Sequence, residues 1–114
     1  MNIKDIKEPG FYRAVTDEVP NIIYEVIKNT DETWLKEEPD AKLIIDTWDF
    51  EYYDADDRRV YEPYEGTLRD PKYMPDIEVE KMEETFTVSG NMGTTLTENK
   101  LTYKEKYNNL IMIE

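Results

Sequence analysis

Apolar and polar residues alternate in short runs along this chain, a pattern typical of β-strands that bury one face. Residues 42–54 carry the clearest example. Alternate positions there hold, together with Asp46, four apolar side chains: Ile44, Trp48, Phe50 and Tyr52. The intervening positions hold Thr47, Asp49, Glu51 and Tyr53. We therefore expect a strand with buried aromatic residues on one face and exposed carboxylates on the other.

Similar runs, bounded by turn signals, predict further strands. We expect them at 11–15, 22–28, 33–36, 58–64, 77–88, 95–104 and 107–113. A change of parity between Val79 and Met82 predicts a β-bulge near Lys81. Ser89 to Gly93 predicts a turn. From Thr97 onward a C-terminal helix remains the alternative to strands.

Together these elements predict a mainly β fold, a single small antiparallel meander of six to eight strands closed as a barrel or folded as a sandwich. At 114 residues the chain has the usual size of one domain, covering 1–114. Residues 62–76 contain three prolines and predict a long loop, and an ordered loop of that length is often functional.

Composition excludes several kinds of site. The chain has no Cys and no His, so it cannot form a disulfide or the common zinc, haem and iron–sulfur centres. Ser89 is its one serine and has no imidazole to activate it. We therefore expect no catalytic residues, no metal and no cofactor. A hydrolase based on paired carboxylates is an alternative that rests only on the 27 acidic residues.

The first residues lack the apolar run of a signal peptide, and no stretch approaches the ~20 apolar residues of a membrane span. We therefore expect a cytoplasmic protein that does not contact membrane.

Charge is distributed unevenly along the chain. The net charge is -13, and residues 31–84 alone hold 19 acidic and 7 basic residues. This excess disfavours direct binding to nucleic acid, whose phosphates it repels. It favours a partner protein whose surface is rich in Lys and Arg. The alternative is that the acidity serves solubility.

The acidic face of residues 46–57 is the candidate partner-binding site. Asp49 and Glu51 would point the same way, about 6.6 Å apart. The turn that follows extends the charge, although Arg58 and Arg59 would neutralise part of it. Tyrosines near it offer large, rigid contacts. The predicted site consists of Asp49, Glu51, Tyr53, Asp54, Asp56, Asp57 and Tyr64.

The sequence EPGFYRAV at 8–15, followed by NIIYEVI at 21–27, resembles the first hairpin of small proteins encoded by phages and other mobile elements. The short, acidic composition is also similar to that of phage inhibitors that mimic nucleic acid. These resemblances imply a mobile-element origin and no individual site residue. We expect a non-catalytic protein that presents carboxylates to a basic, nucleic-acid-binding partner and inhibits it. The alternative is a structural accessory protein that oligomerises through its β-edges.

Overall fold

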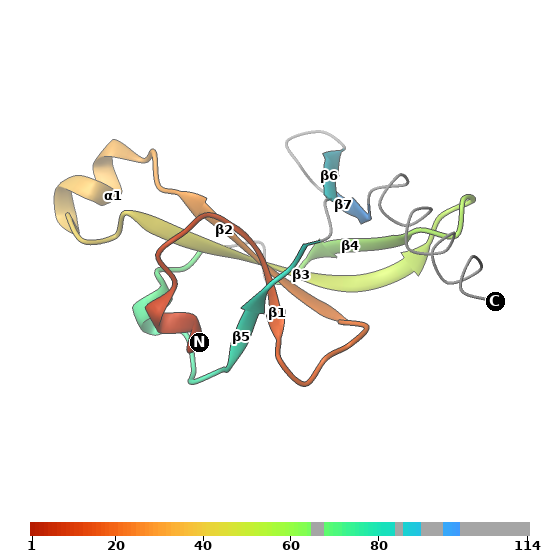
Figure 1. The fold of residues 1–114 in the computed structure, drawn as a ribbon. Helices are drawn as coiled ribbons and strands as arrows, with labels where there is room; N and C mark the ends of the chain where they lie inside the picture. The colour runs from red at the N-terminus through yellow and green to blue at the C-terminus, as the bar shows by residue number, and fades with distance from the viewer. Residues whose placement is uncertain (65–67, 84–85, 90–94, 99–114) are drawn as a thin grey trace.

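The computed structural model describes residues 1–64, 68–83, 86–89 and 95–98, and these form one antiparallel sheet (Figure 1). The strands are β1 (Gly10–Ala14), β2 (Ile22–Lys28), β3 (Leu43–Tyr53), β4 (Arg59–Pro63), β5 (Val79–Lys81), β6 (Phe86–Ser89) and β7 (Thr95–Glu98). Their order is β5-β1-β2-β3-β4-β7-β6, and neighbours are antiparallel throughout. The prediction of a mainly β, antiparallel meander is confirmed.

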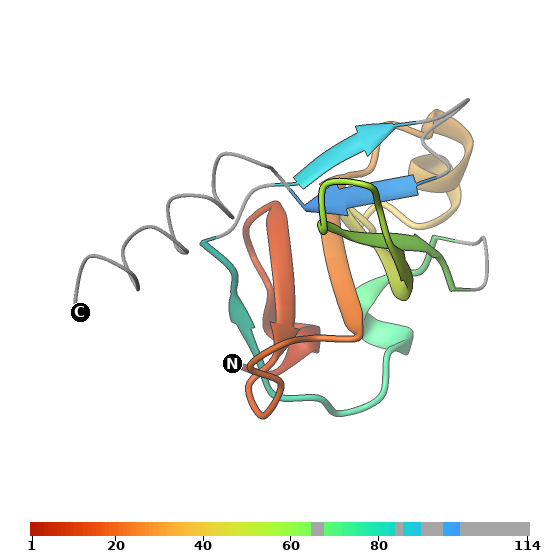
Figure 2. The ribbon, with the colours of Figure 1, turned by 90° about the vertical axis from the view of Figure 1, so that its right-hand side faces the viewer.

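The sheet curls into a half-barrel, as the turned view shows (Figure 2). The curl brings β6, at one end of the strand order, close to β1, which is second from the other end, since the rings of Phe11 on β1 and Phe86 on β6 have centroids 4.9 Å apart. Among the described strands, β5 and β6 remain unpaired with one another. The predicted closure into a complete barrel or sandwich is therefore reached only in part.

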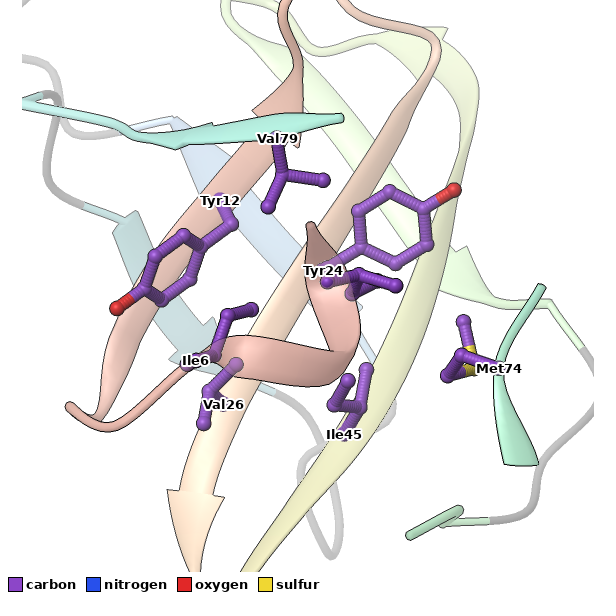
Figure 3. Close-up of a cluster of buried hydrophobic side chains, with 8 residues drawn as sticks. Ile6, Tyr12, Tyr24, Val26, Ile45, Met74 and Val79 are labelled. Atoms are coloured by element: carbon purple, nitrogen blue, oxygen red, sulfur yellow. The ribbon is translucent and has the colours of Figure 1, made fainter. Parts of the chain in front are cut away.

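Both faces of the central strands are covered. Side chains of the sheet itself fill the inner face of the half-barrel, and other segments of the chain pack on its outer face. The inner face buries Ile23, Trp48, Tyr61 and Leu96, with Phe11, Phe50, Met82 and Phe86 packed against them. The outer face buries Ile3, Ile6, Tyr12, Tyr24, Val26, Ile45, Met74 and Val79 (Figure 3). This outer cluster lies under the N-terminal segment, which contains the short helix η1 (Ile3–Asp5), and under the chain around η2 (Pro71–Tyr73).

The strand predicted at 33–36 is wrong, because these residues lie in the helix α1 (Glu32–Glu37). Asp31 caps this helix, and its carboxylate accepts a hydrogen bond of 3.1 Å from the backbone N–H of Trp34. A side-chain oxygen at this position satisfies an N–H that has no partner within the helix. The local cap therefore outweighed the β preference of Thr33 and Trp34.

The single bulged strand predicted at 77–88 is also wrong. The chain forms β5, which pairs with β1, and then β6, which pairs with β7 at the other end of the strand order. The change of parity near Lys81 thus marks the end of one strand and the passage to another part of the sheet. The predicted loop at 62–76 holds η2 and an isolated bridge between Ile45 and Arg69.

The predicted turn at 89–93, apart from Ser89, and everything predicted beyond Glu98 lie outside the described residues. Within the described part of the chain, no helix has the length and apolar character needed to cross a membrane.

Candidate partner-binding site

The hairpin of β3 and β4 carries the predicted site and extends to one end of the sheet, opposite α1 (Figure 1). Two backbone hydrogen bonds close its turn, from the N–H of Asp57 to the carbonyl of Asp54 and from the N–H of Asp54 to the carbonyl of Arg58. Asp57 has a φ of 64°, in the left-handed region that Asp and Asn tolerate better than most residues. The exposed carboxylates of Asp56 and Asp57 are thereby held at the tip.

Asp54 stabilises this turn through both of its carboxylate oxygens. One carboxylate oxygen accepts hydrogen bonds of 2.9 Å from the backbone N–H groups of Asp56 and Arg58, and the other accepts one from the Arg58 Nε at 2.9 Å. The backbone hydrogen bond from Arg58 is the largest reason why the pKa of Asp54 lies below its ordinary value. The Arg58 guanidinium also lies 3.4 Å from the carboxylate of Asp56. The predicted neutralisation by Arg58 is confirmed.

A bulge in β3 separates side chains that the sequence places on one face. Phe50 pairs with Tyr61 and Tyr52 pairs with Val60, so that Glu51 is the extra residue between them. A bulge of this kind shifts the alternation of all residues beyond it. Tyr53 consequently lies with Phe50, their ring centroids 5.1 Å apart. The predicted common face of Asp49, Glu51 and Tyr53 is therefore wrong.

The same bulge changes which aromatic residues are buried. Trp48 is buried as predicted and Phe50 is half-buried, but Tyr52 is 49% exposed. Tyr53 is 56% exposed and Tyr64 57% exposed. The hairpin thus exposes three tyrosines to solvent. The sequence predicts two of them, Tyr53 and Tyr64, as site residues and places Tyr52 on the buried face.

Before the bulge, the hairpin juxtaposes two acidic residues. Asp49 on β3 lies directly opposite Glu62 on β4. Tyr64 follows Glu62 by two residues, and its backbone N–H donates to the carbonyl of Thr47 at 2.8 Å. Among the described residues, no Lys or Arg makes an ion pair with Asp49 or Glu62. Glu62 was missed because only the pairing register reveals that it faces Asp49.

Arg59 does not lie among the acids as predicted. Its guanidinium stacks over the ring of Phe50 at 4.1 Å from the centroid, and its Nη2 donates to the side-chain carbonyl of Asn21 at 3.0 Å. The residue is only 8% exposed. Its charge is thus turned to the inner side of the sheet, where Glu98 lies near it. Like the other cations in the described part of the chain, Arg59 makes no ion pair with Asp49 or Glu62.

A second pair of opposed acids lies on the inner face, where Glu25 on β2 faces Asp46 on β3. The indole N–H of Trp48 donates to the Glu25 carboxylate at 3.3 Å. Burial raises the pKa of both carboxyl groups, and the charge of Asp46 raises the pKa of Glu25 further. The fold therefore favours the protonated form of both carboxyl groups.

Among the residues that the structure describes, no group of three or more acidic side chains is placed to hold a metal ion. No protein-family model, curated protein or solved structure matches this chain.

Proposed function

We propose that this chain is a small, non-catalytic binding protein whose β3–β4 hairpin docks on a basic protein surface. The observation that carries the proposal is the pair of opposed acids, Asp49 and Glu62, with which no cation of the described residues makes an ion pair. Like charges directly opposite each other destabilise a sheet by about 0.2–1 kcal/mol. Places where a sequence works against its own fold are commonly functional sites. A Lys- or Arg-rich partner would turn this repulsion into attraction.

The tyrosines of the hairpin supply the second half of such an interface. Tyr52 and Tyr64 are each about half exposed, on a hairpin whose inner residues are fixed in the core. Tyr53 lies with Phe50 on the inner side and is not part of this surface. Tyrosine offers a large contact area, loses little side-chain entropy and is enriched at interface centres. Charge would therefore guide the encounter, and the aromatic rings would hold the complex.

The proposed activity is inhibition by occlusion in the cytoplasm. A basic groove that binds nucleic acid is the partner surface that this hairpin fits, because both nucleic acid and the hairpin offer closely spaced negative charges. Occupation of the groove by the hairpin would exclude the nucleic acid sterically. The phage or mobile-element origin implied by the sequence resemblance agrees with such a role.

Charge reversal tests the proposal. The doubly reversed Asp49→Lys, Glu62→Lys variant should bind a basic partner, captured from lysate and eluted at graded salt, with an association rate at least about tenfold lower. Its binding should also depend less on salt. The control variant Glu32→Lys, Glu37→Lys changes the net charge equally but lies on α1, away from the hairpin.

An association rate that is unchanged in the hairpin variant would contradict the proposal. So would an equal loss in the α1 control, since net charge and not the hairpin would then govern binding. Retention of the circular dichroism spectrum in both variants separates binding from folding.

A further inference from the structure

A cavity of about 650 Å³ lies at the end of the molecule away from the β3–β4 turn. It is an open depression lined by η1 and the segment after it, by the start of η2, by the end of β2 and by the start of β3. Its volume is in the range of sites that bind small molecules.

The charge of this cavity is opposite to that of the chain. Its lining includes Lys4, Lys7, Lys28, Lys42 and Lys72. Five of the 14 basic residues of the chain thus meet around one cavity, against two acidic residues, Asp40 and Asp70. The lining has a net charge of +3 in a protein whose net charge is -13. A concave site of one sign focuses its field and attracts ions of the opposite sign.

Two of the five lysine ammonium groups form ion pairs with carboxylates. Lys4 lies 3.0 Å from a carboxylate oxygen of Asp76. Lys72 lies 2.9 Å from Glu38 and 3.7 Å from Asp70. Asp70 is held in turn because its carboxylate caps η2 and accepts from the backbone N–H of Lys72 at 3.1 Å.

The other three lysines make no ion pair with any described residue. Lys7 follows η1, Lys28 ends β2 and Lys42 precedes β3. The chain brings Lys28 and Lys42 to the same place because Asn29 donates its backbone N–H to the carbonyl of Lys42 at 2.8 Å. Three unpaired cations around one cavity repel one another, and a bound anion would remove this repulsion.

Part of the cavity wall is apolar. Ile6 belongs to the outer core, as Figure 3 shows, and Leu43 packs against the same core. Pro71, the first residue of η2, is buried beside them. An inorganic ion would leave this surface uncovered, whereas an organic group attached to the anion would cover it.

We propose that this cavity binds an organic phosphate of nucleotide size. Lys7, Lys28 and Lys42 hold the phosphate groups, and the wall formed by Ile6, Leu43 and Pro71 contacts the organic part. Lysine suits this role because its ammonium is a mobile point charge that phosphate oxygens accept from several directions. The site shares no residue with the acids and tyrosines of the candidate partner-binding site, so the proposal stands independently of the partner-binding function.

A titration followed by two-dimensional ¹H–¹⁵N NMR tests the site, with ATP and inorganic phosphate as separate probes at physiological salt. ATP should shift the backbone signals around Lys7, Lys28 and Lys42 in a saturable way, and more tightly than inorganic phosphate does. The variants Lys28→Gln and Lys42→Gln should each weaken ATP binding by about tenfold, since each removes a charge-assisted contact. Both side chains are exposed, so these variants keep the fold.

The control is Lys36→Gln, which makes the same change of charge on an exposed face of α1 that does not line the cavity. Its affinity for ATP should equal that of the unaltered protein. The proposal is overturned if ATP causes no saturable shifts, if the shifts lie elsewhere, or if the control weakens binding as much as Lys28→Gln does. Equal affinity for ATP and inorganic phosphate would overturn the role of the apolar wall.

Discussion

At the scale of single residues, the carboxylates of the β3–β4 hairpin have opposite roles. The Asp54 carboxylate accepts hydrogen bonds from two backbone N–H groups and from the Arg58 guanidinium, so its charge stabilises the turn. The Asp49 carboxylate accepts no such hydrogen bond from the residues that the structure describes and lies opposite another acid, so its charge opposes the fold. Residue type and spacing alone could not separate these roles, because the difference depends on which backbone groups and strands surround each carboxylate.

Substitution of Asp49 and Asp54 should therefore change stability in opposite directions. Asp49→Lys places a cation opposite Glu62 and should raise the free energy of unfolding by about 0.2–1 kcal/mol while it weakens partner binding. Asp54→Asn loses the ion pair with Arg58 and should lower the unfolding free energy. Urea unfolding of both variants at pH 7 measures the two effects. A destabilised Asp49→Lys protein would show that Asp49 supports the fold and would remove the reason to regard it as a binding residue.

At the scale of elements, period-two alternation predicts the central strands well. The predicted bounds of β2 coincide with the observed Ile22–Lys28, and β3 differs by one residue at each end. Alternation does not show which neighbour a strand pairs with. The pattern therefore predicts one strand at 77–88, where the structure has two, β5 and β6. It also does not show the bulge at Glu51, because a bulge leaves the sequence pattern intact and changes only the register.

The capped helix α1 gives a test at this scale. Asp31→Ala removes the acceptor for the N–H of Trp34 and should cost about 1 kcal/mol of stability. Faster hydrogen exchange at Trp34 should accompany the loss, because six helical residues cannot hold this end without the cap. Glu37→Ala, at an exposed position in the last turn, should leave exchange at Trp34 unchanged. Equal exchange in all three proteins would mean that packing and not the cap fixes the helix.

At the scale of the whole molecule, acidic and basic residues gather at opposite ends of the fold, which the net charge of the sequence does not show. Acidic residues gather on the β3–β4 hairpin, while lysines from three distant parts of the chain surround the cavity at the other end. The acidic region could be predicted because its residues are close in sequence. The lysine cavity could not, because the pairing of β2 with β3 joins only Lys28 and Lys42, and Lys7 and Lys72 reach them through the packing of the segments around η1 and η2.

The half-buried carboxyl groups predict how the stability of the whole molecule depends on pH. Burial is the largest cause that raises the pKa of Glu25, Asp46 and Glu98 above their ordinary values. Between the ordinary and the raised pKa, the folded state binds more protons than the unfolded state, so stability should increase as the pH falls through this window. Asp54 and Asp76 have lowered pKa values, and their contributions are lost only as the pH falls below the ordinary carboxyl value of 3.8.

The free energy of unfolding should therefore be higher at about pH 5 than at about pH 7.5. Urea unfolding measures this free energy. Dilute solution is used because pH 5 is close to the isoelectric point of about 4.4, where proteins tend to aggregate. Glu25→Gln keeps an oxygen to accept from the Trp48 indole but removes the charge beside Asp46. This variant should be more stable than the unaltered protein at about pH 7.5 and should lose part of the pH dependence. A steeper or unchanged pH dependence in the variant would mean that the opposed pair of Glu25 and Asp46 is not its source.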